Sequence, residues 1–232
     1  MSSEVLKLDW CSHAAAKYAV EHWHYSRSLP TPPIVKVGVW EADSFIGCVL
    51  FSRGANNNIG KALGLKVTEV AELTRVALTS HSSPVSRIVK VAISLVRGQS
   101  PGLRCLVSYA DPKQGHVGGI YQAGGWVYLG QSPDSTEYVA PDGKQWHGRM
   151  VSASGRTRVY GQTRSVWRHD QCTPVTCPGK HKYAKPLDRA MSNILATISR
   201  PYPKRAASID SDAAGFQSAE GGAGPTAALQ DS

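Results

Sequence analysis

An aspartate and a histidine follow an apolar run near the middle of the chain, and both are side chains that can move a proton. Asp111 comes directly after residues 103–110, which are expected to form a buried strand. Ligands of α/β sheets bind beside the carboxyl ends of strands, so Asp111 is placed to accept a proton from an amine. The alternative is a structural aspartate that caps the turn before Pro112. His116, flanked by glycines, can act as a base or a ligand, or simply occupy a turn.

The segment from His22 to Tyr25 places two imidazoles, an indole and a phenol side by side in the sequence. His24 and Tyr25 offer nitrogen and oxygen ligands that suit iron, and Asp111 can complete such a mixed site. Adjacent side chains of a helix face different ways, so a two-ligand site requires the helix to end there. The alternative is a stacked aromatic cluster, which can receive a planar ring.

A second group of potential ligands lies in the last third of the chain. His169, Cys172, Cys177 and His181 are spaced closely enough for a closed structural zinc site. The spacing is not that of a standard zinc finger, and His181 lies in a Gly-Lys-His-Lys-Tyr segment where it can have another role.

Arg75 lies in an otherwise apolar segment, residues 67–79, which is expected to be a strand. A buried arginine needs a partner. That partner is either a carboxylate such as Glu72, in a structural salt bridge, or an anion of the substrate.

The net charge of +9 is concentrated in one region. Residues 142–205 contain 13 Lys and Arg against three acidic residues, with aromatic residues interleaved. Such a region is suited to the phosphates of nucleic acid. The residues expected to contact DNA are Arg149, Arg156, Arg158, Arg164, Lys180 and Lys182. Residues 206–232 contain acidic residues and no Lys or Arg, and their low complexity predicts a disordered acidic tail.

Composition excludes several classes of protein. No apolar stretch reaches the roughly 18 residues of a membrane-spanning helix, and the first residues do not resemble a signal peptide. Five cysteines form no even secreted framework, so we expect a cytoplasmic protein with reduced thiols and no membrane association. The oligomeric state stays open, with a dimer as one option.

The elements that must position these residues alternate between helices and strands. Periodicity and turn residues predict a mixed α/β sheet with helices packed on it. We expect helices over residues 10–25, 84–98 and 117–123, and strands over 34–41, 44–52, 67–79, 103–110 and 126–131. Ala42 and Asp43 form the predicted hairpin turn. The expected organisation is a catalytic core over residues 1–141, a basic DNA-binding extension over 142–205 that packs on it, and the tail.

Two of these segments resemble the GNAT acyltransferase fold. Residues 72–78 followed by a capped helix look like its central strand and helix, and residues 119–130 look like its late helix and strand. Within that superfamily the chain is most similar to the phage Mom family, over about residues 8–205. The similarity rests on the order and spacing of His22-Trp-His-Tyr25, Glu72-Leu-Thr-Arg75, Ser108-Tyr-Ala-Asp111, Gly115-His-Val-Gly118 and Tyr121-Gln-Ala.

The resemblance implies a specific function. Mom proteins convert adenine in duplex DNA to N6-carbamoylmethyladenine, which shields phage DNA from host restriction endonucleases in the host cytoplasm. Iron dependence has been suggested for the family, and its group donor is not settled. By this resemblance Tyr121 occupies the place of the general acid, and the alternatives are a ligand or a structural tyrosine of the core. We expect Asp111, alone or with His116, to manage the N6 proton, and Arg75 to orient the donor or to stabilise developing negative charge. A flipped adenine would lie against the aromatic segment 22–25.

The turn before the second predicted helix departs from the GNAT pattern. GNAT enzymes have a glycine-rich loop there whose amides cradle the pyrophosphate of coenzyme A. Residues 79–87 contain no glycine, so acetyl-CoA is a doubtful donor. Ser83 and Ser86 can still hold a smaller anion. Two other functions remain open: an acyl-CoA N-acyltransferase acting on a small amine or a protein, and a non-enzymatic DNA-binding protein with this fold.

Overall fold

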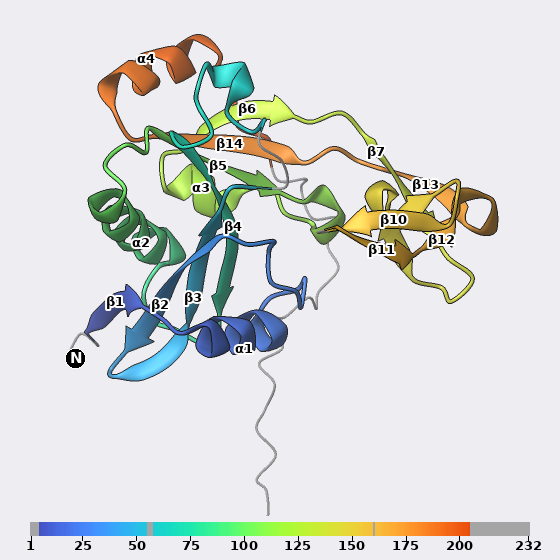
Figure 1. Ribbon diagram of the computed structural model, residues 1–232. Helices are drawn as coiled ribbons and strands as arrows, with labels where there is room; N and C mark the ends of the chain where they lie inside the picture. Colours follow the sequence, from blue (N-terminus) through green and yellow to red (C-terminus); the bar gives the residue numbers. More distant parts are fainter. Residues whose placement is uncertain (1–4, 55–57, 160, 205–232) are drawn as a thin grey trace, which may run out of the picture.

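The computed structural model describes residues 5–54, 58–159 and 161–204, and a large sheet runs through them (Figure 1). The sheet has seven strands in the described residues. In spatial order they are β1 (Leu6–Trp10), β2 (Ile34–Glu41), β3 (Ser44–Ser52), β4 (Val70–Leu78), β5 (Cys105–Ala110), β14 (His181–Pro186) and β6 (Val127–Gln131). All neighbouring pairs are antiparallel except β4 and β5.

Helices cover both faces of this sheet, because its central strands alternate apolar side chains between two cores. Leu106 belongs to the core beneath α2 (Val85–Gln99) and α3 (Gly119–Ala123). Cys105 and Val107 belong to a core on the other face, beneath α4 (Arg189–Thr197). On that second face α1 (His13–Trp23) packs against Cys48 and Leu50 of β3. The predicted mixed α/β sheet flanked by helices is thus confirmed.

The parallel pair at the centre of the sheet is short. Only residues 70–72 of β4 are paired with residues 105–107 of β5, although both strands continue beyond this point. Strands that diverge leave a space between them, and this divergence creates the main cavity described below.

Most predicted elements are present with small shifts at their ends. The hairpin turn is confirmed, since Ala42 and Asp43 both have positive φ (46° and 63°), as a tight two-residue β-turn requires. Ser12 caps α1 through its side chain, so the first helix starts later than expected. The residues before it form β1, which the sequence did not predict.

A group of small β elements lies between β6 and β14 in the chain; we call residues 135–177 the β-rich insertion (Figure 1). One three-stranded sheet contains β13 (Thr173–Cys177), β7 (Ser135–Val139) and β8 (Gln145–His147). The other strands form two pairs: β10 (Arg156–Val159) with β11 (Gln162–Ser165), and β12 (Trp167–Arg168) with β9 (Val151–Ser152). Short 3-10 turns complete the described chain: η1 (Lys61–Leu63), η2 (Pro112–Gln114), η3 (Gly148–Met150) and η4 (His169–Gln171).

The expected boundary at residue 141, between a catalytic core and a basic extension, does not separate the strands of the main sheet. Strand β14 comes from the basic region, yet it pairs with both β5 and β6 inside the main sheet. Its Tyr183 and Ala184 are fully buried, one in each core. The basic region therefore contributes an interior strand as well as an insertion.

The acidic tail over residues 206–232 lies outside the described residues. No helix in the described part of the chain combines the length and the apolar character needed to cross a membrane.

Candidate active site

A cavity of about 440 Å³ opens where β4 and β5 separate; we call it the main pocket. Residues 23–25, 74–76, 109–110 and 115–121 line it. Five residues selected from the sequence meet here: His24, Tyr25, Arg75, His116 and Tyr121. The remaining catalytic candidate, Asp111, lies next to the lining without being part of it.

The end of α1 brings two adjacent side chains to the same wall of the pocket. The helix ends at Trp23, and His24 has extended backbone angles (φ −118°, ψ 135°). The His24 and Tyr25 rings can therefore stack, with centroids 4.3 Å apart, and His116 meets Tyr25 edge-on at 5.6 Å. His22 lies elsewhere, stacked on Tyr18 at 4.0 Å, so three of the four residues in the predicted cluster line the pocket.

The His24 ring is held in one tautomer. Its Nδ1 atom lies 3.1 Å from the Ser26 backbone nitrogen and 2.8 Å from the Ser26 hydroxyl. The backbone N–H can only donate and the hydroxyl can donate as well, so we infer that Nδ1 is the acceptor and that the proton of the neutral ring is on Nε2. Burial, with help from the charges of Arg75 and His116, lowers the pKa of His24 to about 4. At neutral pH the ring is uncharged, and its Nε2–H group is a hydrogen-bond donor.

Arg75 is half-buried in the pocket wall and its described partners are neutral. Its guanidinium donates to the carbonyl oxygens of Ser28 (3.2 Å) and Thr74 (2.8 Å). No salt bridge of Arg75 occurs among the described residues, so the pairing with Glu72, one of the two alternatives for this arginine, is not formed. Burial lowers the pKa of Arg75, while Tyr25 and Glu72 act in the opposite direction. The pocket therefore contains a half-buried cation that has no bonded carboxylate among the described residues.

The Tyr121 hydroxyl points to an internal serine. The Ser108 hydroxyl lies 2.7 Å from the Leu73 carbonyl oxygen and 2.7 Å from the Tyr121 hydroxyl. A serine has one proton to donate and a carbonyl can only accept, so we infer that Tyr121 donates to Ser108. Burial raises the pKa of Tyr121 to about 12, which keeps the phenol neutral at physiological pH.

The loop that carries His116 is fixed by a close contact with β14. Gly118 has a φ of +83°, and a Cβ atom there would lie 2.3 Å from the Tyr183 ring. The Tyr183 hydroxyl donates to the Val117 carbonyl oxygen at 2.5 Å. The interior strand β14 thus sets the position of the loop at the pocket.

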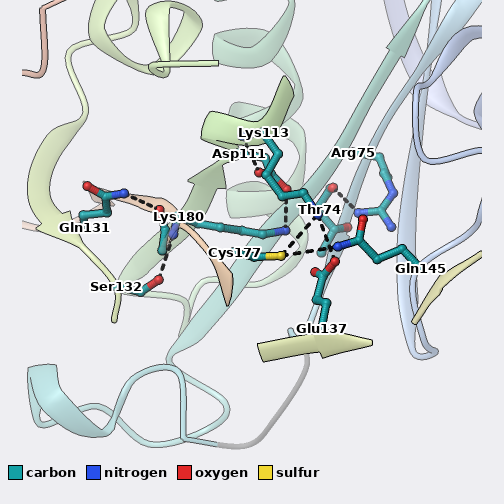
Figure 2. A network of polar contacts seen from close by, with 11 residues as sticks. Thr74, Arg75, Asp111, Lys113, Gln131, Ser132, Glu137, Gln145, Cys177 and Lys180 are labelled. Carbon is teal, nitrogen blue, oxygen red and sulfur yellow. Dashed lines mark hydrogen bonds and ion pairs between the residues drawn. The ribbon is translucent and has the colours of Figure 1, made fainter. Parts of the chain in front are cut away.

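Asp111 caps the turn that follows β5, which was the structural alternative for this residue. It caps η2 by accepting the Lys113 N–H at 3.0 Å, and its carboxylate forms an ion pair with Lys180 at 3.0 Å. Lys180 directly precedes β14, and Figure 2 shows this pair beside a contact between the core and the β-rich insertion, in which Lys113 reaches Glu137 (2.9 Å) and the sulfur of Cys177 (3.3 Å). These contacts anchor the β-rich insertion next to the main pocket.

Iron does not fit His24 in this arrangement. A histidine that binds a metal through Nε2 carries its proton on Nδ1 and donates it, whereas Nδ1 of His24 accepts from Ser26. Within the described ranges, His, Cys, Asp and Glu side chains gather nowhere in threes as a metal site requires. We therefore derive no step of a reaction through iron bound to His24 and Tyr25.

The four residues expected to bind zinc each have other neighbours. The His169 ring packs on Tyr138, with centroids 5.0 Å apart, and Cys172 is half-buried. Cys177 is buried against Lys113, and His181 hydrogen-bonds to the Tyr128 hydroxyl at 2.9 Å. This arrangement does not suit a zinc site, because ligands must converge on one ion.

The turn before α2 already contains an anion. Glu41, only 4% exposed, accepts the backbone N–H groups of Ser82 (2.8 Å) and Ser83 (2.7 Å). Burial opposes its ionisation, but the hydrogen bonds from Ser83 and Ser82 outweigh burial and lower the pKa of Glu41 to about 2. Ser83, expected to hold a ligand anion, instead holds this internal carboxylate.

Ser86, the other expected donor-binding residue, lines a second cavity of about 720 Å³ beside α2. The charged residues of this α2 cleft are all basic: Arg87, Lys90, Arg97 and Lys185. Lys185 also donates to the Gly124 carbonyl oxygen at 2.8 Å. The cleft is therefore suited to an anion, although not through the amides of the turn before α2.

The residues expected to contact DNA lie in three different environments. Arg156, Arg158 and Arg164 are exposed on the β10–β11 ribbon. Lys180 is exposed and paired with Asp111. Lys182 is half-buried, and burial lowers its pKa. The side chain of Arg149 lies outside the described residues.

Two residues of the site, Ser108 and Glu41, were not predicted from the sequence. Ser108 is a single hydroxyl in an apolar strand, and that mismatch could have marked it. Glu41 ends a strand at a hairpin, where an exposed acid is usual, so no local signal distinguishes it.

Comparisons with known proteins agree with the sequence resemblance. A family model described as the Mom protein family matches residues 5–204. Methylcarbamoylase mom of Escherichia phage Mu is 26% identical over 211 residues, which cover 87% of this chain and 85% of the phage protein.

Solved structures with a similar fold include acetyltransferases. A probable acetyltransferase of the GNAT family from Chromobacterium violaceum has a TM-score of 0.43 and 10% identity, covering 79% of this chain and 83% of its own. An acetyltransferase from Thermus thermophilus has a TM-score of 0.42 and 14% identity, covering 81% of this chain and 100% of its own.

Proposed function

Because the chain belongs to the Mom protein family, we propose that it is a transferase that modifies DNA. The proposed reaction converts adenine in duplex DNA to N6-carbamoylmethyladenine, and the product protects phage DNA from restriction endonucleases in the host cytoplasm. The name of the phage Mu relative, a methylcarbamoylase, supports this chemistry.

The observation that carries the proposal is the composition of the main pocket. An adenine of duplex DNA must leave the base stack before its N6 atom can react, and aromatic side chains receive flipped bases. The pocket offers the rings of Tyr25, His24 and His116 next to a half-buried cation, Arg75. Its volume of about 440 Å³ lies in the usual range for small-molecule sites.

The proposed transfer is a displacement on a donor that carries a carbamoylmethyl group and an anionic leaving group. The N6 nitrogen forms a bond to the methylene carbon of the donor. The bond from that carbon to the leaving group breaks, and its electron pair departs with the leaving group. The N6 proton passes to a base in the pocket. No electrons are gained or lost overall.

His116 is the residue best placed to take the N6 proton, since it lines the pocket with an exposed ring. The Nε2–H group of His24 is available to donate to a ring nitrogen of the base. Arg75 neutralises the charge that develops on the leaving group. Asp111 becomes a positioning residue, because its carboxylate holds η2 and Lys180. Tyr121 supports the pocket wall through Ser108.

DNA is proposed to dock on the basic side of the β-rich insertion. A two-stranded ribbon fits the major groove of DNA, and β10–β11 presents three exposed arginines. Changing Arg156, Arg158 and Arg164 together to alanine should lower the log–log salt slope of duplex binding by about 2–3. An unchanged slope would remove this surface from the proposal.

The reaction is tested by mass spectrometry of nucleosides from DNA co-expressed with the protein. We expect a deoxyadenosine in which one hydrogen is replaced by a carbamoylmethyl group. His116→Ala should reduce the modified fraction more than Asp111→Asn does. The reverse order would indicate that Asp111, and not His116, is the base that accepts the N6 proton. Unmodified DNA with normal duplex affinity would instead indicate a non-enzymatic DNA-binding protein.

One observation favours an acyl-CoA N-acyltransferase as the alternative. The α2 cleft is basic and large enough for a phosphorylated donor. Against this, the amides that would bind a pyrophosphate already donate hydrogen bonds to Glu41. Isothermal titration with acetyl-CoA separates the two: micromolar binding would support the acyltransferase, and the absence of heat supports the DNA-modifying enzyme.

A further inference from the structure

A third cavity, of about 410 Å³, lies within the β-rich insertion; we call it the tryptophan pocket. Trp146 of β8, Met150 of η3 and Trp167 of β12 line it together with Ser165 and Val166. None of these residues lines the main pocket. The insertion therefore has an aromatic pocket of its own.

The indole N–H group of Trp146 has no acceptor in the described part of the chain. It is a buried polar atom without a hydrogen-bond partner among the described residues. A buried donor left unpaired costs stability, on the order of 1–3 kcal/mol, and such groups are few in native proteins. An acceptor atom brought by a ligand would remove this cost once the indole turns toward the cavity.

The tryptophan pocket adjoins a positively charged surface. Ser165, part of its lining, pairs directly with Arg156 across the β10–β11 ribbon. Arg158 and Arg164 are exposed on the same ribbon. Among the described residues, none that lines the cavity is acidic. Its occupant should therefore have an aromatic face, hydrogen-bond acceptors and a neighbouring negative charge.

A nucleobase attached to its phosphate backbone combines these three properties. Bases stack on aromatic side chains through their π-faces, whatever their identity, while Arg and Lys neutralise the phosphates. A small planar ligand without a phosphate would not use the ribbon, and a fully paired duplex would not present a free base face.

We propose that the tryptophan pocket binds a second unstacked base of the DNA strand, separate from the adenine in the main pocket. This inference rests on the proposed action on DNA. The pocket holds the strand in its distorted form while the target adenine is outside the stack.

The test compares the affinity of the full-length protein for a short single-stranded DNA and for the duplex of the same sequence. Trp167→Ala should weaken single-strand binding roughly ten-fold or more, because a base–aromatic stack is lost. Duplex binding, which depends mainly on phosphates, should change less than about two-fold. Trp10→Ala is the matched control, since Trp10 is 42% exposed on the edge strand β1, at the other end of the molecule (Figure 1).

Trp146→Phe separates a ligand-binding indole from a structural one. Phenylalanine keeps an aromatic ring and removes only the unpaired N–H group. We expect single-strand binding to weaken several-fold while the thermal unfolding temperature stays the same or rises. A lower unfolding temperature with unchanged single-strand binding would overturn the proposal, as would equal losses on both forms of DNA in Trp167→Ala.

A double variant tests whether the main pocket, and not the tryptophan pocket, causes the larger loss of single-strand affinity. The effect of Trp167→Ala should persist in a Tyr25→Ala background, and its disappearance there would count against a separate base site. Nucleoside mass spectrometry distinguishes this proposal from the proposed function. If the DNA is modified but the tryptophan variants do not change single-strand affinity, only the second base site is disproved. If the variants weaken single-strand binding but the DNA is not modified, only the proposed enzymatic function is disproved.

Discussion

The turn before α2 and the wall of the main pocket both attract an anion, yet only one of them is filled by the protein. At the turn, Glu41 accepts two backbone N–H groups and is buried with them. In the pocket, Arg75 bonds only to carbonyl oxygens, and no described carboxylate pairs with it. The first charge is satisfied inside the fold, whereas the second has only carbonyl partners among the described residues, and we propose that it serves a ligand.

The largest effect is expected at the unfilled site. Arg75→Ala should lower the rate of DNA modification by about 10²–10³-fold, because the charge of the leaving group is no longer neutralised. The rate is measured as modified nucleoside per unit time. Arg189→Ala, exposed on α4 and outside all three cavities, is the control and should keep most of the activity. If Arg75→Ala retained full activity, the contrast between the two sites would disappear.

Removing the internal anion should affect stability rather than turnover. Glu41→Gln deletes a buried charge whose hydrogen bonds come from Ser82 and Ser83, at a cost of about 2–3 kcal/mol in the free energy of unfolding. Urea titration measures this cost. Because the folded pKa of Glu41 is about 2, its contribution is complete above about pH 4.5 and is lost as the pH falls toward 2. An unchanged unfolding midpoint at pH 7 would show that the carboxylate does not stabilise the turn.

A smaller effect with a different pH window is expected from His24. Its folded pKa of about 4 lies below the value of 6.5 for a free imidazole, so the unfolded state binds more protons between these values. Stability therefore rises with pH across this window and is lost as the pH falls through it. The change should be about 1 kcal/mol, since the ring is only partly buried. His24→Asn should flatten the profile of unfolding free energy between pH 4 and 6.5, and a parallel profile would assign the effect to another group.

The smallest effect is expected from Tyr121→Phe. Its ring packs against Trp126 and Tyr183, and Phe preserves these contacts. Loss of the hydroxyl removes one hydrogen bond to Ser108, at a cost of about 1 kcal/mol in stability. Activity should fall by less than about ten-fold, whereas a general acid would contribute about 10²-fold or more. A loss of that larger size would make Tyr121 the acid that the resemblance implies.

Local patterns in the sequence predicted most of the main sheet. Residues 34–52 alternate and contain a tight turn, and residues 85–99 repeat apolar side chains at helical spacing. These signals are strong because each element buries one continuous face. Strand β14 has no such pattern, since its lysines and histidine alternate poorly with Tyr183 and Ala184. Its place was decided by hydrogen bonding to β5 and β6, which no local pattern encodes.

The sequence predicted which residues line the candidate site, but it did not predict the role of each residue. His24, Tyr25, Arg75, His116 and Tyr121 were all selected from residue type and resemblance, and they meet in one pocket. The function of Asp111 depends on Lys180, which is far away in sequence. In the same way, the tautomer of His24 depends on the turn that places the Ser26 amide against its ring.

Periodicity and motif spacing are local properties, so they were enough to predict the fold class, the family and the residue types that could do chemistry. Which charges find a partner depends instead on the folded arrangement of the chain. The carboxylate of Glu41 is stabilised by hydrogen bonds from amides some forty positions away, while Arg75 has no carboxylate partner in the described residues. The state of a buried charge depends on the partners that folding brings to it, and those partners come from distant parts of the chain.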